Sequence, residues 1–178
     1  MNNQTITDIY ATNDKVREQF KQMIVDLPDK QANFLPEGEK WSIAQLVEHI
    51  SIVEEGMAKI SAKLLTQAQA TGKKSDGRAN LTENFVTKAI EARSQKFEAP
   101  DMVRPSGKQT IAESLAKMEE NRKRLKELRP LFESVECSDF KFPHPFMGEL
   151  NASEWLALIG GHEARHLRQI ESILKKAE

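Results

Sequence analysis

Residues 155–173 read WLALIGGHEARHLRQIESI, and they combine a helical pattern with two histidines in positions where a buried helix face usually carries apolar residues. The apolar members of the stripe recur in steps of three and four, as on one face of an α-helix: Trp155, Ile159, Ile170 and Ile173. His162 and His166 fill the remaining steps, so both are predicted to face the core. Side chains four residues apart lie one above the other on a helix, which allows both imidazoles to bind one metal ion.

The rest of the chain is predicted to form further amphipathic helices joined by polar loops. Three capping boxes mark helix starts. In a capping box, the cap residue and a Glu or Gln three positions later each bind the other's backbone amide through their side chains. The three boxes are Ser42 with Gln45, Thr110 with Glu113, and Asn151 with Glu154. The predicted helices span residues 13–27, 42–69, 82–97, 110–135 and 152–176.

Two prolines limit these helices. Pro28 is expected to end the first helix, and Pro130 to kink the fourth or end it early. No stretch shows the sustained period-two alternation of a strand, and residues 136–150 are expected to form a turn-rich connection. The patterns therefore predict an all-α fold, a four-helix bundle with an additional short helix, in a single domain over residues 1–178.

Composition excludes several classes of partner. The 26 basic and 27 acidic residues are spread along the chain and give a net charge of −1, which offers no basic surface for nucleic acid or for a membrane. No apolar run approaches the roughly 18 residues of a membrane-spanning helix, and the N-terminus lacks the pattern of a signal peptide. Cys137 is the single cysteine, so no intramolecular disulfide can form. These features predict a cytoplasmic protein.

A third metal ligand is needed, because two histidines from one helix hold a catalytic metal poorly. His49 lies on the shoulder of the apolar stripe of the predicted helix 42–69 and should also face inward. Facing helices of a bundle can contribute side chains to a common interior site. His49, His162 and His166 are therefore predicted to form a three-nitrogen site for a divalent metal, Zn²⁺ or Ni²⁺, with one or two positions open. The alternative is that all three are core histidines with ordinary hydrogen bonds.

Glu163 raises two further alternatives. Residues 162–166 fit the H-E-x-x-H pattern of zinc proteases, in which the glutamate is the general base. This makes Glu163 a weak candidate for a catalytic residue, since the pattern is short; otherwise it is a charged neighbour of the histidines. A di-iron carboxylate site would need a second Glu-x-x-His motif, but Leu46 stands three residues before His49.

Four segments together resemble the DinB-like superfamily. They are WSIAQLVEH at 41–49, HPFMGEL at 144–150, EWL at 154–156 and HEARHLRQI at 162–170. The resemblance covers nearly the whole chain and implies a four-helix bundle that holds a divalent metal through His49, His162 and His166. Relatives include transferases and isomerases that use small bacterial thiols such as bacillithiol and mycothiol. Dimers are common among them, so a homodimer is also an expectation.

The function expected from these observations is that of a metal-dependent enzyme acting on a small molecule. Its most concrete form, which rests on the resemblance, is a small-thiol S-transferase. The alternatives are a metal-dependent hydrolase and a non-catalytic metal-binding bundle with a role in stress response. An open coordination position that reaches solvent would favour an enzyme, whereas a fourth protein ligand would indicate a structural metal.

Three residues outside the histidine trio have separate interpretations. His144 lies between two prolines, which favours a turn or capping role, with a position in a pocket near the metal as the alternative. Arg122 interrupts an apolar stripe and needs a carboxylate partner if buried, so it is either part of an ion pair or a substrate anchor. Cys137 has no feature that predicts a nucleophile.

Overall fold

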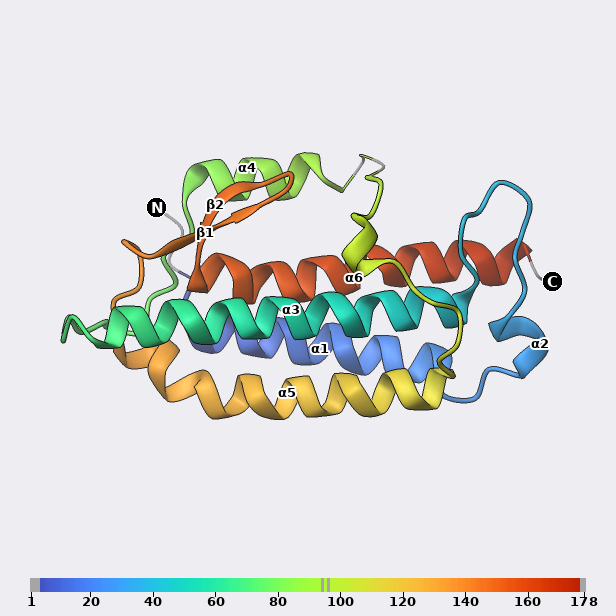
Figure 1. Ribbon diagram of the computed structural model, residues 1–178, viewed down its shortest axis with the longest axis horizontal. Helices are drawn as coiled ribbons and strands as arrows, with labels where there is room; N and C mark the ends of the chain where they lie inside the picture. Colours follow the sequence, from blue (N-terminus) through green and yellow to red (C-terminus); the bar gives the residue numbers. More distant parts are fainter. Residues whose placement is uncertain (1–3, 94, 96, 177–178) are drawn as a thin grey trace.

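The structure is a computed structural model that describes residues 4–93, 95 and 97–176. Four long helices lie side by side (Figure 1): α1 (Ile6–Ile24), α3 (Ile43–Gln69), α5 (Ile111–Ser134) and α6 (Ala152–Lys176). Helices α1 and α6 run in one direction, and α3 and α5 run in the opposite direction. Helix α3 packs against both α5 and α6, and α1 packs against α6. The predicted four-helix bundle is confirmed.

Shorter elements lie outside the bundle. They are α2 (Asp29–Ala32), α4 (Glu83–Glu91), the 3₁₀ helix η1 (Asp101–Val103) and the antiparallel strands β1 (Lys141–His144) and β2 (Gly148–Asn151). The long crossover from α3 to α5 carries α4 and η1, and these lie with the β1–β2 hairpin along α6 (Figure 1). Among the described residues, no helix has the length and apolar character needed to cross a membrane.

Several predicted boundaries were wrong. Helix α1 begins at Ile6 and not near residue 13, because Thr5 and Asp8 form a capping box that the sequence analysis missed. Helix α4 ends at Glu91 and not at residue 97. The predicted span of 110–135 agrees with α5, which continues past Pro130 to Ser134, so the proline does not end this helix early.

The β1–β2 hairpin was also missed, in a segment that was predicted to hold only turns. Phe142 pairs with Leu150 in its ladder. Strands of four residues, one of them containing Pro143, are too short and too interrupted to show a period-two pattern. The three predicted capping boxes are all present.

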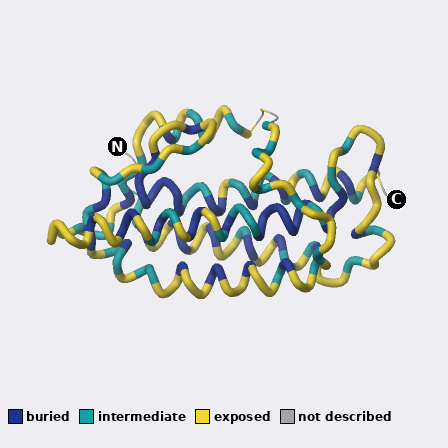
Figure 2. The backbone as a smooth tube through the Cα atoms, viewed as in Figure 1, coloured by how far each residue is buried: buried dark blue, intermediate teal, exposed yellow. Residues whose placement is uncertain are grey.

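The buried core consists of two hydrophobic clusters at opposite ends of the bundle. One contains Ile9, Leu65, Leu125 and Leu156, and the other contains Phe20, Leu46, Met118 and Ile170, each with further neighbours. On all four long helices, buried polar side chains lie between the positions of the two clusters. We call them the polar layer: Asn13, Arg17, Ser51, Glu54, Asn121, Arg122 and Glu163. Figure 2 shows the buried residues running along the inside of the bundle.

Ion pairs bring opposite charges together in the polar layer. One terminal nitrogen of Arg17 lies 2.9 Å from both carboxylate oxygens of Glu54, and Arg17 Nε donates to Glu163. Arg122 lies 3.7 Å from Glu163 and from Asp14, so its predicted carboxylate partners are present. Burial raises the pKa of Glu54, against the opposing effect of the Arg17 charge. Such a layer costs desolvation free energy, which only well-placed partners offset.

Gly160 allows α6 to approach α1 closely at the polar layer. A Cβ atom at Gly160 would lie 2.0 Å from Asn13 Oδ1, whereas a Cβ at Gly161 would meet nothing within 4 Å. Asn13 is fixed by the hydrogen bond that its Nδ2 donates to the carbonyl of Leu156, at 2.9 Å. The first glycine is therefore required by packing and the second is not.

We expect G160A to lower the free energy of unfolding by about 1–3 kcal/mol, because Asn13 must move or break its bond to Leu156. G161A should raise it by about 0.5–1 kcal/mol, since alanine is the better helix former at an unobstructed site. Urea unfolding followed by circular dichroism measures both. Equal stability of the two variants would contradict this account of the α1–α6 contact.

Candidate metal centre

The three predicted histidines converge from two helices. Helix α3 supplies His49, and α6 supplies His162 and His166. The Nε2 atom of His162 lies 3.2 Å from Nε2 of His49 and 3.2 Å from Nε2 of His166. Two nitrogens bound tetrahedrally to one ion, with bonds of about 2.0–2.1 Å, would be about 3.3 Å apart. The spacing of the histidine trio therefore fits a single metal ion.

Hydrogen bonds on the far side of two rings determine their orientation. His49 Nδ1 lies 2.7 Å from the carbonyl oxygen of Val103, and His166 Nδ1 lies 3.0 Å from Oε1 of Gln169. Both acceptors require a proton on Nδ1, which leaves a lone pair on each Nε2. The Gln169 amide in turn donates to Glu39 at 3.4 Å. This is the outer arrangement that metal-binding histidines commonly have.

The three rings have too few protons for their two Nε2–Nε2 contacts, which favours a cation between the rings. With lone pairs on Nε2 of His49 and His166, a proton on Nε2 of His162 could satisfy only one of its two contacts at 3.2 Å. In the other contact the lone pair of a neighbouring ring would face a nitrogen at hydrogen-bond distance with no proton between the two atoms. A divalent ion that accepts all three lone pairs removes this repulsion, so the residues present fit a metal.

The trio is held in the neutral form that metal binding needs. Burial lowers the pKa of His49 and of His162, and it lowers the pKa of His166 to about 3. Mutual repulsion adds to this effect, since positive charge on any one of the rings disfavours protonation of its neighbours. At pH 7 all three imidazoles are therefore neutral, and no proton competes with a metal for their lone pairs.

Two contacts that were not predicted from the sequence hold the His49 ring in place: one with Trp41 and one with the carbonyl of Val103. The ring of Trp41 lies with its centroid 4.8 Å from that of His49. The second contact is with the segment that carries the carbonyl of Val103. It comes from the crossover between α3 and α5, far from His49 in sequence, so no local pattern could have indicated it.

Glu48 fixes this crossover segment to α3. Its buried carboxylate accepts hydrogen bonds from the amide of Ser106 at 3.0 Å, the hydroxyl of Ser106 at 2.6 Å and the amide of Gly107 at 2.9 Å. Gly107 has a φ of +72°, which favours glycine at this turn. The residue before His49 thus anchors the loop whose Val103 carbonyl orients the His49 ring.

Glu163 does not join the trio. Among the described residues, the group of side chains able to hold a metal together consists of the three histidines alone. The Glu163 carboxylate instead lies in the polar layer with Arg17 and Arg122. Adjacent positions on a helix differ by about 100° in direction, so His162 and Glu163 face different neighbours.

We expect E163Q to lower the free energy of unfolding by about 3 kcal/mol, because it removes a buried partner of Arg17. The metal content of the folded variant should equal that of the wild type, since the carboxylate is not at the trio. Urea unfolding and elemental analysis measure the two quantities, and E171Q, at an exposed position of α6, is the matched control. A stable E163Q that loses its metal would instead make Glu163 a ligand.

His144 caps the turn of the hairpin, as its position between prolines predicted. Its Nδ1 accepts hydrogen bonds from the amides of Phe146 at 3.2 Å and Met147 at 3.1 Å. Burial lowers its pKa to about 4, so the ring is neutral at pH 7. The ring centroid lies 5.3 Å from that of Trp155, which is itself buried in the core as expected. The buried Cys137 has a pKa raised by burial, which disfavours the nucleophilic thiolate.

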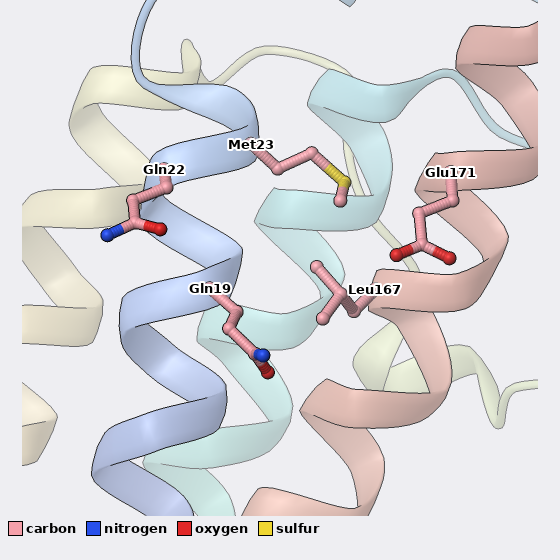
Figure 3. Close-up of a pocket in the computed structure, with 5 residues that line it drawn as sticks. All are labelled: Gln19, Gln22, Met23, Leu167 and Glu171. Atoms are coloured by element: carbon pink, nitrogen blue, oxygen red, sulfur yellow. The ribbon is translucent and has the colours of Figure 1, made fainter.

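A separate hollow lies between α1 and α6 (Figure 3). It has a volume of about 410 Å³ and is lined by Gln19, Gln22, Met23, Leu167 and Glu171. None of the three histidines lines it. It also holds no cluster of metal-binding side chains among the described residues.

The fold and the site together define a helical-bundle protein with a candidate three-histidine metal centre. The chain belongs to the DinB superfamily, whose sequence pattern matches residues 12–170. The matched region contains all three histidines, and the resemblance noted from the sequence motifs is confirmed.

Individual relatives agree with this assignment. The uncharacterized protein YuaE of Bacillus subtilis (strain 168) is 28% identical over 154 residues, which cover 85% of this chain and 88% of that protein. The crystal structure of TT2238, described as a four-helix bundle protein, matches with a TM-score of 0.60 and 21% identity, covering 94% of this chain and 98% of that one. An uncharacterised protein from Escherichia coli UTI89 matches with a TM-score of 0.54 and 12% identity, covering 98% and 95%. The two structural matches support the fold alone.

Proposed function

We propose that this protein is a metal-dependent enzyme in which His49, His162 and His166 hold one divalent ion, Zn²⁺ or Ni²⁺. The observation that carries the proposal is the convergence of three neutral Nε2 atoms at a spacing suited to one ion. No fourth histidine, cysteine or carboxylate joins them within the part of the chain that the structure describes. A site with three protein ligands keeps a coordination position for water or substrate, which is typical of catalytic metals.

The side chains around the trio have distinct tasks in this proposal. Val103 and Gln169 hold the rings of His49 and His166 in the orientation that aims their lone pairs inward. Trp41 packs against the His49 ring. Because neutral imidazoles add no negative charge, they reduce the electrophilic character of the ion less than carboxylate or thiolate ligands would. When bound, the ion would supply Lewis acidity, which lowers the pKa of a water or thiol held at the open position.

The reaction we propose is transfer of a small thiol to an electrophile, and membership of the DinB superfamily supports it. In this reaction a sulfur–carbon bond forms as the leaving group departs with its bonding electrons, and the thiol proton passes to solvent. The chain's own contribution is to position the sulfur, since no described carboxylate belongs to the trio to act as a base there.

Metal content tests the site directly. The protein purified without an affinity tag and loaded with Zn²⁺ or Ni²⁺ should contain close to one ion per chain by elemental analysis. H162A should lose most of it, because a ligand central to the trio is gone. H144Q, which alters the hairpin cap outside the trio, should keep it. A wild type that stays empty after loading, or an H162A that keeps its ion, would contradict the proposed centre.

Activity is tested with the loaded protein, bacillithiol or another small thiol, and a halogenated aromatic electrophile. We expect conjugation that depends on the metal, stops with a chelator and is absent in H162A. If the metal binds but esters and amides are hydrolysed instead, the protein is a hydrolase and the transferase proposal is wrong. If neither reaction occurs with a full complement of metal, a non-catalytic binding role replaces both.

A further inference from the structure

The charge balance at the histidine trio is positive once a metal is bound. Three neutral imidazoles offset none of the charge of a divalent ion. The two carboxylates adjacent to the ligands in sequence are committed elsewhere: Glu48 accepts three hydrogen bonds from Ser106 and Gly107, and Glu163 pairs with Arg17. A ligand that brings negative charge would therefore bind this centre more favourably than a neutral one.

Arg165 adds a further positive charge beside the trio. It lies on α6 three residues after His162 and one before His166, so it shares the helix turn that carries both histidines. Its guanidinium contacts Ala92 and Phe97 of the crossover, the segment whose Val103 carbonyl also bonds to His49. In agreement with this placement, its charge lowers the pKa of all three histidines. Since it would also repel a bound metal ion, its presence there is unfavourable unless an anion is bound between them.

Two contacts hold the Arg165 guanidinium in place without neutralising it. Its Nη1 donates to the carbonyl oxygen of Ala92 at 3.2 Å, and its central carbon lies 5.1 Å from the ring centroid of Phe97. Among the described residues no carboxylate pairs with it, in contrast to Arg17 and Arg122 in the polar layer. The remaining N–H groups of its fork have the geometry that binds a carboxylate with two parallel hydrogen bonds.

Aromatic rings continue from this guanidinium toward the hairpin. Phe97 packs against Phe146 with ring centroids 4.7 Å apart, and Phe146 lies 6.0 Å from His144. Phe146 is 44% exposed, so part of its ring is open to a bound molecule. The carbon skeleton of a bound molecule could rest against these rings while its charged group meets Arg165.

We propose that Arg165 binds the carboxylate of a small anionic substrate whose other donor atom takes the open position of the metal. The inference rests on the proposed metal centre and names the class of substrate for it. Arg165 is thus a substrate-binding residue, and the preference for a negatively charged substrate comes from this one side chain together with the uncompensated charge of the centre.

The experiment uses the full-length protein loaded with Co²⁺, whose visible absorption changes when sulfur binds. Mercaptoacetate, mercaptopropionate and mercaptobutyrate are each titrated against the corresponding primary amide, which keeps the thiol and removes the charge. For the best-fitting length we expect the carboxylate to bind the wild type about tenfold more tightly than its amide. In R165Q this ratio should fall to about two, because only the charge of the ion then favours the carboxylate, with the affinity for the amide and the Co²⁺ content unchanged.

R168Q is the matched control, because Arg168 is an exposed arginine on the same helix. It should keep the ratio of the wild type, and circular dichroism should show all variants folded. If the wild-type ratio persists in R165Q with a full complement of Co²⁺, the proposed role of Arg165 is overturned while the metal centre stands. A wild type that takes up no Co²⁺ would overturn the metal centre itself, and with it the proposed role of Arg165.

Discussion

The arrangement of the whole bundle depends on Arg17, whose guanidinium lies between Glu54 and Glu163 in the polar layer. These three side chains join α1, α3 and α6 at mid-length. A buried charge is tolerated only with its partners in place, so the layer disfavours other registers and rotations of the helices. Because Glu163 must face Arg17, the preceding residue on α6, His162, is turned toward α3 and meets His49. The ion pairs that fix the bundle also assemble the candidate site.

Apolar packing and buried polar side chains occupy different lengths of the four long helices. The two hydrophobic clusters on either side of the polar layer supply the favourable burial, and the layer between them supplies specificity at a cost in desolvation. The trio lies beside the second cluster, where Leu46, Ile50 and Ile170 are buried. Placing neutral imidazoles among apolar side chains keeps them unprotonated, which makes this environment useful for metal binding as well as for packing.

Local sequence patterns were sufficient to predict the long helices and the histidine trio, because three-and-four spacing and capping boxes are properties of residues close together in sequence. The same reasoning could have extended α1 to Ile6, since Thr5 and Asp8 carry a capping-box pattern in which aspartate replaces the more common glutamate. Other features depend on contacts between distant segments. The partner of Glu163 is Arg17, 146 positions away, and the short strands of the hairpin are defined by each other more than by their composition.

The crossover between α3 and α5 has a role that its irregular sequence does not suggest. Its Val103 carbonyl orients His49, its Ser106 and Gly107 are fixed by Glu48, and its Phe97 contacts Arg165. The three histidines lie on the long helices α3 and α6, while the contacts named above come from this irregular segment. Loops tolerate change better than packed helices do. Under the proposed function, substitutions in the crossover would change which molecule is bound while the histidines keep their places on α3 and α6, so a shared trio need not imply a shared substrate.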